Sequence, residues 1–200
     1  MTKCYQHCRC LLPGILVLAA ALASSIKSGV IAAELPTNKN DIATEMVENA
    51  DFEASQLAGW SLVSTNDGNA EIDLEVESPF DASNPHSLKI TLKADGSRCS
   101  VRNIGTAKMK FDSDTWYDLA FCARTENNKH FGLVVSLESD DGSKICGRAT
   151  IPEVGANWKK YALAIHARQS ATRGRLVISV FEAGTIWLDF VSLSAREPSQ

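Results

Sequence analysis

The stretch E-I-D-L-E-V-E, residues 71–77, places an apolar residue at every second position and an acidic residue between them. Side chains of a β-strand point alternately to the two faces of a sheet, so this pattern is typical of a strand with one buried and one solvated face. Residues 88–92 repeat it. Further strand-like segments follow at 100–104, 117–124, 131–139, 145–151, 158–167, 175–181 and 185–193. Many short strands without a helical period predict an all-β chain, an antiparallel β-sandwich and most simply a jelly roll.

The same alternation assigns the faces of the strands. It turns the core side chains inward, namely Tyr117, Leu119, Phe121, Leu133, Val135, Leu137, Leu176, Ile178 and Val180. It turns another set outward, namely Arg102, Cys122, Arg124, Val134, Ser136, Glu138, Cys146, Arg148, Val177, Ser179 and Phe181. The spacing of Leu188, Val191 and Leu193 breaks the strict period, which predicts a β-bulge near Asp189 and Phe190.

Residues 1–33 have the character of a signal peptide. Lys3 and Arg9 precede the apolar run 11–23, and cleavage is expected after Ala23 or near Ala32 and Ala33. This run is shorter than the roughly 20 apolar residues that span a bilayer, although a retained membrane anchor is the alternative. Residues 34–45 are polar and read as a linker, 46–195 as the sandwich and 196–200 as a tail. We therefore expect secretion to the extracellular space or periplasm, with no membrane attachment after cleavage.

The charge of the chain argues against polyanionic partners. The net charge is −4, and removal of residues 1–33, which hold three basic residues and no acid, changes it to −7. No cluster of Lys and Arg is evident in the sequence. An acidic chain without such a cluster matches neither a nucleic-acid backbone nor an anionic membrane surface.

Three cysteines remain after the leader, at positions 99, 122 and 146. An odd number allows at most one disulfide, and the spacing matches no redox or zinc motif. A chain of this size can bury enough core without a bridge, so these cysteines are expected mainly as small buried residues.

Five motifs stand in a fixed order over nearly all of residues 46–195: N-x-D-F-E with G-W (49–60), P-H-S-L-K-I (85–90), W-Y-D-L-A-F-C-A-R (116–124), W-K-K-Y (158–161) and I-W-L-D-F-V-S-L (186–193). On these motifs the chain resembles the CenC-type carbohydrate-binding modules, the grouping that includes families four, nine, sixteen and twenty-two. Such modules accompany secreted arabinofuranosidases and xylanases. The resemblance implies a galactose-binding-domain-like jelly roll that binds polysaccharide.

The resemblance also implies a structural calcium ion where the two ends of the domain meet. Carried over by motif position, Glu53 and Asp189 would be side-chain ligands. Asp51 and a residue near Ser87 would contribute, for example through backbone carbonyls. Oxygen donors from several segments are what Ca²⁺ requires. The alternative is that Glu53 and Asp189 cap strands or pair with surface Lys or Arg.

The candidate sugar-binding residues are Arg102, Glu138, Arg148 and Phe181, because alternation places them on one outer face. An aromatic ring and planar polar groups are what proteins use to hold sugar rings and hydroxyls. Of the four tryptophans, Trp116 is the least constrained by its motif position. The alternative is that the charged residues form a solvated strip of salt bridges.

The sequence favours a binding protein over an enzyme. It contains neither G-x-S-x-G nor H-E-x-x-H, and Glu138 has no evident acidic neighbour with which to form a glycosidase pair. The expectation is a secreted, non-catalytic binder of a plant-type polysaccharide such as xylan, arabinoxylan or β-glucan, with a separate glycosidase as a further expected partner. The alternatives are a structural or adhesive surface domain without a sugar site and, third, a glycoside hydrolase.

Overall fold

The structure is a computed structural model of the 200-residue chain that describes residues 44–54, 56–64, 69–81, 83–94, 98–105, 109–126 and 131–197. The signal peptide expected at 1–33, residues 34–43 of the expected linker and residues 198–200 of the tail lie outside the described residues.

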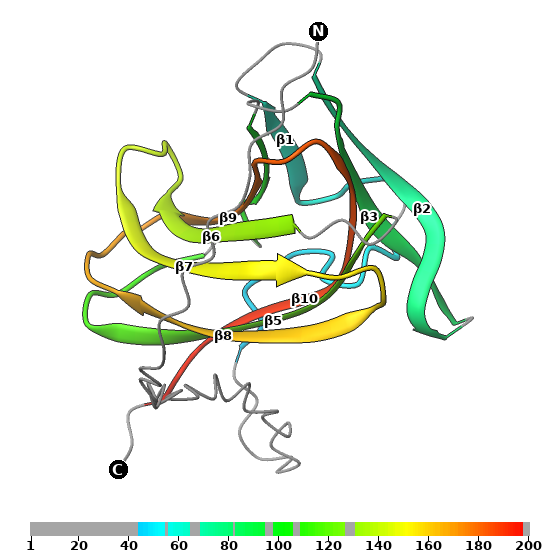
Figure 1. Ribbon diagram of the computed structural model, residues 1–200. Helices are drawn as coiled ribbons and strands as arrows, with labels where there is room; N and C mark the ends of the chain where they lie inside the picture. Colours follow the sequence, from blue (N-terminus) through cyan, green and yellow to red (C-terminus); the bar gives the residue numbers. More distant parts are fainter. Residues whose placement is uncertain are drawn as a thin grey trace, which may run out of the picture. The chain divides into compact units, whose positions relative to one another are not determined.

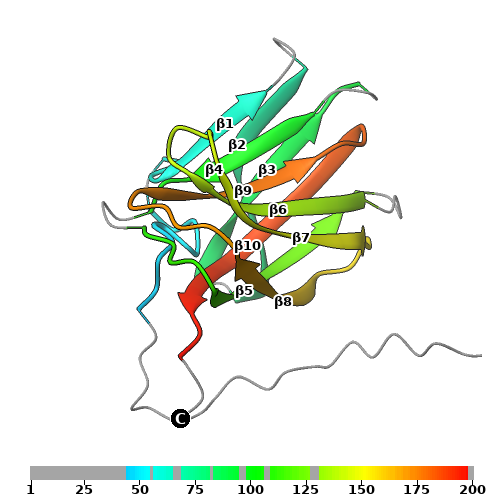
Figure 2. The same cartoon turned by 90° about the vertical axis from the view of Figure 1, so that its left-hand side faces the viewer.

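The described residues form two antiparallel sheets that pack face to face (Figures 1 and 2). Sheet A has the strand order β1 (Trp60–Ser64), β4 (Cys99–Asn103), β9 (Gly174–Val180), β6 (Phe131–Ser139) and β7 (Ile145–Val154). Sheet B has the order β2 (Ala70–Asp81), β3 (Asn84–Leu92), β10 (Gly184–Ala195), β5 (Thr115–Thr125) and β8 (Lys159–Ala167). The predicted all-β jelly-roll sandwich is confirmed. In the part of the chain that is described, no helix has the length and apolar character needed to cross a membrane.

The core lies between the sheets and consists of the side chains that alternation turns inward. Leu133, Val135 and Leu137 of β6 face Tyr117, Leu119 and Phe121 of the other sheet's β5, and all six are at most 2% exposed. Removing this apolar surface from water stabilises the sandwich by roughly 25 cal/mol per Å². The period-two reading of the faces therefore holds for these strands.

Two local features depart from the sequence reading. Strand β1, the short segment W-S-L-V-S, was not predicted. Cys146 is 1% exposed and belongs to the core, so the prediction that it faces outward is wrong. The cause is a shift in register between β6 and β7, where Leu137 pairs with Gly147 but Glu138 pairs with Ile145. This irregularity inverts the alternation at Cys146 and leaves Ile145 51% exposed.

The bulge predicted near Asp189 is present. The pairing of β10 with β5 shifts between Asp189 and Ser192, and Phe190 has a φ of 50°. The shift allows Leu188 and Val191, three positions apart, both to be fully buried. Asp189 comes directly after Leu188 and lies at the start of this bulge.

The segment before β1 runs beside β10, so the two ends of the domain meet. The Met46 N–H donates to the Leu193 carbonyl at 3.0 Å, and the Val191 N–H donates to the Ala50 carbonyl at 2.8 Å. The Glu45 carboxylate accepts the Leu193 N–H at 3.0 Å. These bonds bring residues 45–53 to the bulge of β10.

All three described cysteines are free and buried. Burial raises the pKa of Cys99 to about 11 and, with the nearby negative charge of Asp189, that of Cys122 to about 11. They serve as small core or interior residues, as the sequence suggested.

Candidate functional site

The outer face of sheet A carries the candidate sugar-binding residues. One row of paired residues crosses all five strands, in the order Ser61, Arg102, Val177, Ser136, Arg148. The next row consists of Val63, Ser100, Ser179, Val134 and Thr150. Between the two arginines the side chains are short, and Val177 and Ser136 are each only 4% exposed. Ser100 and Ser179 are buried as well, so the accessible hydroxyls of these two rows are those of Ser61 and Thr150.

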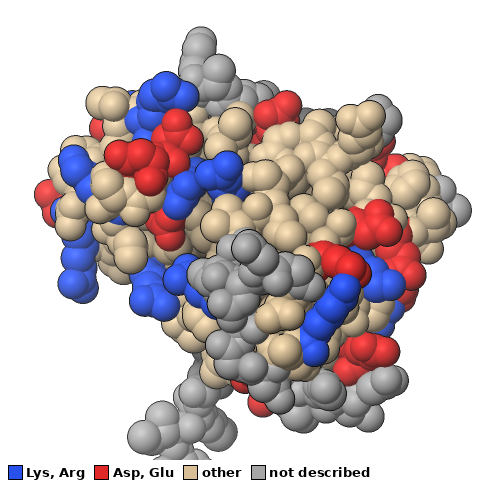
Figure 3. Space-filling model, turned by 90° about the horizontal axis from the view of Figure 1, so that it is seen from above, with Lys and Arg blue, Asp and Glu red and all other residues tan. Residues whose placement is uncertain are grey.

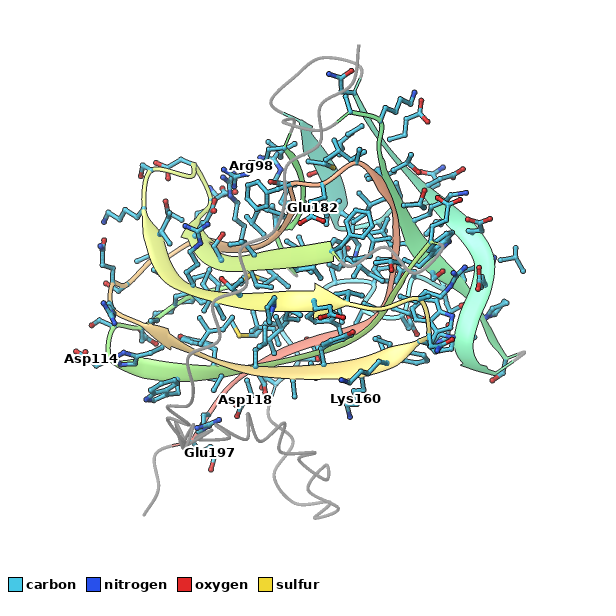
Figure 4. All side chains as sticks on the ribbon, in the orientation of Figure 1. Arg98, Asp114, Asp118, Lys160, Glu182 and Glu197 are labelled. Carbon is cyan, nitrogen blue, oxygen red and sulfur yellow. The ribbon has the colours of Figure 1, made fainter. Side chains whose placement is uncertain are left out.

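Phe181 and Arg98 lie at one end of this face. Phe181 is 39% exposed, and the Arg98 guanidinium lies 5.5 Å from the centre of its ring. Arg98 also donates to the hydroxyls of Ser100 and Ser179, each at 3.2 Å, and these two hydroxyls are 2.8 Å apart. Figure 4 shows Arg98 beside β9, on the side of the sandwich opposite to Asp118 and Lys160. The Phe181 ring and the Arg98 guanidinium therefore lie next to each other on this face.

Glu138 lies at the other end and is already engaged. It is 7% exposed, and its Oε2 accepts hydrogen bonds from Nε and Nη2 of Arg175 at 3.1 and 2.8 Å. Its Oε1 accepts the hydroxyl of Ser136 at 2.7 Å. The structure thus places Glu138 on the same face as Arg102, Arg148 and Phe181, but in a closed ion pair.

Arg102 and Arg148 differ from Glu138 in this respect. The Nε of Arg102 donates to the neutral hydroxyl of Ser61 at 2.8 Å. Arg148 is exposed. Within the described residues neither guanidinium forms an ion pair with a carboxylate. Both can therefore offer N–H donors to a ligand.

Sequence reasoning missed Arg98 and Arg175. Arg175 alternates with the core residue Leu176, so its outward direction was readable from the sequence. Its partner was not readable, because the pairing of Glu138 with Arg175 depends on the register between β6 and β9. Arg98 lies just outside its strand, where alternation gives no signal.

The candidate metal ligands lie where residues 49–53 reach the bulge of β10. The Glu53 carboxylate accepts the His86 backbone N–H at 2.7 Å, and its other oxygen lies 2.8 Å from His86 Nδ1. Asp189 is fully buried, and its Oδ2 accepts the Ser78 hydroxyl at 3.3 Å. Burial, together with the negative charges of Glu53 and Asp51, raises the pKa of Asp189 to about 7. The structure thus brings the three predicted acids into electrostatic contact.

Further oxygen atoms converge on Glu53. The Asn84 amide group faces Oε1 of Glu53 and lies 3.2 Å from the backbone carbonyl oxygen of Asp51. Its NH₂ group can donate to both oxygens, or its own oxygen can join them around a cation. The Ser87 hydroxyl is buried and has no hydrogen-bond partner among the described residues. This donor set consists of hard oxygen atoms, which fits calcium.

Side chains alone do not complete a metal site. No group of three His, Cys, Asp or Glu side chains within the described ranges is arranged to hold a metal ion. A cation at Glu53 would therefore need the Asp51 carbonyl and the Asn84 amide as ligands. Calcium accepts both kinds of oxygen.

The outer face of sheet B carries Trp187 and Trp116. Trp187 is 7% exposed and lies under Arg124, whose guanidinium is 3.7 Å from the ring centre and is paired with Glu77. Trp116 is 45% exposed and stacks on His166 with a centroid distance of 4.8 Å. These contacts give Arg124 a structural role on sheet B.

No protein-family model and no curated protein sequence matches this chain. Among solved structures, an arabinose-bound α-L-arabinofuranosidase matches with a TM-score of 0.66 and 21% identity over 76% of this chain. The match covers 26% of that enzyme, so the chain spans about a quarter of its length. The xylan-binding domain of a Paenibacillus barcinonensis protein matches with a TM-score of 0.53 and 13% identity, over 80% of this chain and 97% of that one. A carbohydrate-binding module in complex with β-1,4-galactotriose matches with a TM-score of 0.53 and 13% identity, over 76% and 99% of the two chains. The fold is that of carbohydrate-binding modules.

Proposed function

We propose that this chain is a secreted, non-catalytic carbohydrate-binding protein of the CenC type that takes a plant-type polysaccharide such as xylan, arabinoxylan or β-glucan. One observation carries the proposal. On a fold shared with a xylan-binding domain, one outer face of sheet A carries the exposed ring of Phe181 together with Arg102 and Arg148, neither of which is paired with a described carboxylate.

The chemistry of this face suits sugar rings. The hydroxyls of Ser61 and Thr150 and the guanidinium N–H groups can replace the water that binds sugar hydroxyls, and strands hold them at fixed spacing. The exposed edge of Phe181 offers an apolar contact for the C–H face of a ring. A face rather than a closed pocket suits a polymer, because a chain can extend beyond the protein in both directions.

A calcium ion completes the proposal as a structural element. Glu53 and Asp189, with Asp51 and Asn84, would hold it, and it would supply positive charge that compensates the buried Asp189 carboxylate. The two segments that would hold the ion already lie side by side without it, because the Val191 N–H donates to the Ala50 carbonyl. The ion would thus stabilise the junction of the domain ends.

The proposal of a non-catalytic role rests on the state of the carboxylates. A glycosidase needs two carboxyl groups that flank the scissile bond. Glu138 is 7% exposed and closed by Arg175, and Asp189, whose pKa is raised to about 7, is fully buried. Neither can reach a polymer as placed. A separate glycosidase is the proposed partner that would act on the bound polysaccharide.

A second candidate, a structural or adhesive surface domain, is favoured by one observation. Phe181 is the large aromatic residue exposed on the outer face of the described part of sheet A, and Arg98 lies over its ring. A module that relies on aromatic stacking would offer more open rings.

Affinity electrophoresis of the full-length chain in gels that contain xylan, arabinoxylan, β-glucan or cellulose separates the two functions. The carbohydrate-binding proposal predicts retardation that is lost in Arg148→Ala and weakened in Phe181→Ala. Arg168→Ala, which removes an exposed arginine outside both sheets, is the matched control and should behave as the parent. Absence of retardation in every polymer would favour the adhesive domain.

A further inference from the structure

The outer face of sheet A carries four arginines, Arg98, Arg102, Arg148 and Arg175. The described carboxylates near them are Glu138, Glu153 on β7 and Glu182, which follows Phe181. On sheet B most acids of β2 are paired with bases, since Glu71 contacts Lys93, Glu75 contacts Lys89 and Glu77 contacts Arg124. Figure 3 shows both signs of charge on either side, with basic side chains more numerous at the left.

Glu138 does not neutralise Arg102 or Arg148. Arg175 occupies Oε2 of Glu138 with two hydrogen bonds, and Ser136 occupies Oε1. The Nε of Arg102 donates to the uncharged Ser61 hydroxyl. Two guanidinium charges therefore remain without a carboxylate among the described residues, and a sugar without charge cannot supply one.

The two guanidiniums occupy one row of the sheet. Val177 on β9 and Ser136 on β6 separate Arg102 on β4 from Arg148 on β7, so the arginines stand three strand spacings apart, or about 14 Å between backbones. The residues between them have short side chains. An extended polymer that lies along this row can contact both arginines at once.

The chemistry of the guanidinium indicates the kind of polymer. Its planar fork matches the two oxygens of a carboxylate, and such charge-assisted bonds are stronger than those to neutral hydroxyls. Resting on the carbohydrate-binding function proposed above, we propose that sheet A binds an acidic polysaccharide, and that Arg102 and Arg148 hold carboxylates of its uronic acid residues.

A matched pair of polymers tests this proposal on the full-length chain. Isothermal titration calorimetry compares a glucuronic acid-bearing xylan with the same xylan after its carboxyl groups have been reduced to alcohols. We expect the reduced polymer to bind at least about tenfold more weakly, because it forfeits hydrogen bonds between charged groups. Binding of the acidic polymer should also weaken with added salt.

Single-residue variants show which arginines bind the carboxylates of the polymer. Arg102→Ala and Arg148→Ala should each lower affinity for the acidic xylan about tenfold and leave affinity for the reduced xylan much less changed. Arg148→Lys keeps the charge but loses the fork, so it should fall between Arg148→Ala and the parent. Arg168→Ala is the control for loss of one exposed positive charge, and far-ultraviolet circular dichroism checks that each variant is folded.

The outcomes separate this proposal from the more general one. Equal affinity for native and reduced xylan would overturn the uronic acid proposal and leave carbohydrate binding intact, whereas absence of binding to any polysaccharide would overturn both. Equal or tighter binding of a sulfated polysaccharide or of single-stranded DNA would show a general polyanion surface and would also overturn it. So would acidic-xylan binding that is unchanged in Arg102→Ala and Arg148→Ala.

Discussion

Glu138 on β6 and Arg175 on β9 form a nearly buried ion pair in which two guanidinium nitrogens donate to one carboxylate oxygen, at 3.1 and 2.8 Å. Their side chains are 10% and 14% exposed. The pair joins neighbouring strands of sheet A at the edge of the proposed binding face. It bears on which arginines remain for a ligand, because it engages Glu138 and Arg175 with each other.

Arg175→Ala should destabilise the fold. It would leave the buried Glu138 carboxylate without its charged partner, a change that costs about 3 to 5 kcal/mol in the free energy of unfolding. Urea denaturation monitored by tryptophan fluorescence measures this cost. Arg173→Ala, which breaks a pair whose arginine is 82% exposed, is the control and should cost less than about 1 kcal/mol. Equal costs for the two variants would contradict the importance assigned to the buried pair.

Removal of calcium should lower the melting temperature. An ion present at 100 times its dissociation constant stabilises the folded state by about 2.7 kcal/mol, which corresponds to roughly 5 to 10 °C for a domain of this size. Differential scanning calorimetry with and without a chelator measures the shift. Glu53→Gln should reduce it, whereas Asp112→Asn, at an exposed position outside the cluster, should not. An unchanged melting curve on chelation would contradict the proposed ion.

The stability of the calcium-free protein should fall as the pH rises. Burial raises the pKa of Asp189 from 3.8 to about 7, so the folded state holds this proton more tightly than the unfolded chain. The free energy of unfolding should therefore decrease between about pH 4 and pH 7, by up to about 4 kcal/mol. Urea titrations in a chelator at several pH values measure this slope.

Two comparisons isolate the role of Asp189 in that slope. Asp189→Asn removes the titrating group, so the decrease should disappear. Saturating calcium should suppress it as well, because the ion compensates the carboxylate charge. A calcium-free parent whose stability rises over this pH range would show that Asp189 is ionised in the fold at little cost.

The thiols of the folded protein should resist modification. The pKa values of Cys99 and Cys122 are raised by burial to about 11, so little thiolate exists at pH 8. A colourimetric thiol reagent should react with Cys99, Cys122 and Cys146 only after addition of denaturant. Rapid reaction of the native protein would show that these strands open readily.

Period-two alternation was sufficient to predict the sandwich because most strands have one buried face. The pattern of Leu133, Val135 and Leu137 is kept in the structure, and Ile72 and Leu74 pack against the core. Val76 departs from it, since it is 76% exposed just before a shift in the register of β2 with β3. Alternation failed at Cys146, where a shift in the register of the pairing inverts the faces. A register shift such as the one beside Cys146 leaves little trace in a sequence. The bulge at Asp189 could be predicted because the spacing of the apolar residues is itself broken there.

For the candidate site, the sequence predicted only the face of the sheet to which each side chain points. Alternation placed Arg102, Glu138 and Arg148 on one face, and the structure agrees. Which charges neutralise each other depends on the strand order and register of sheet A, and these are set by long-range pairing. For the same reason the approach of the Asn84 amide to Glu53 could not be read from a sequence in which the two residues are 31 positions apart.

The most direct test of the central claim is a nuclear magnetic resonance titration of the full-length chain with an acidic xylo-oligosaccharide. The account predicts that amide shifts concentrate on sheet A, at Arg102, Ser136, Arg148 and Val177, with smaller changes toward Phe181. Shifts that concentrate instead around Trp116 and His166 on sheet B, or no shifts at any ligand concentration, would contradict it.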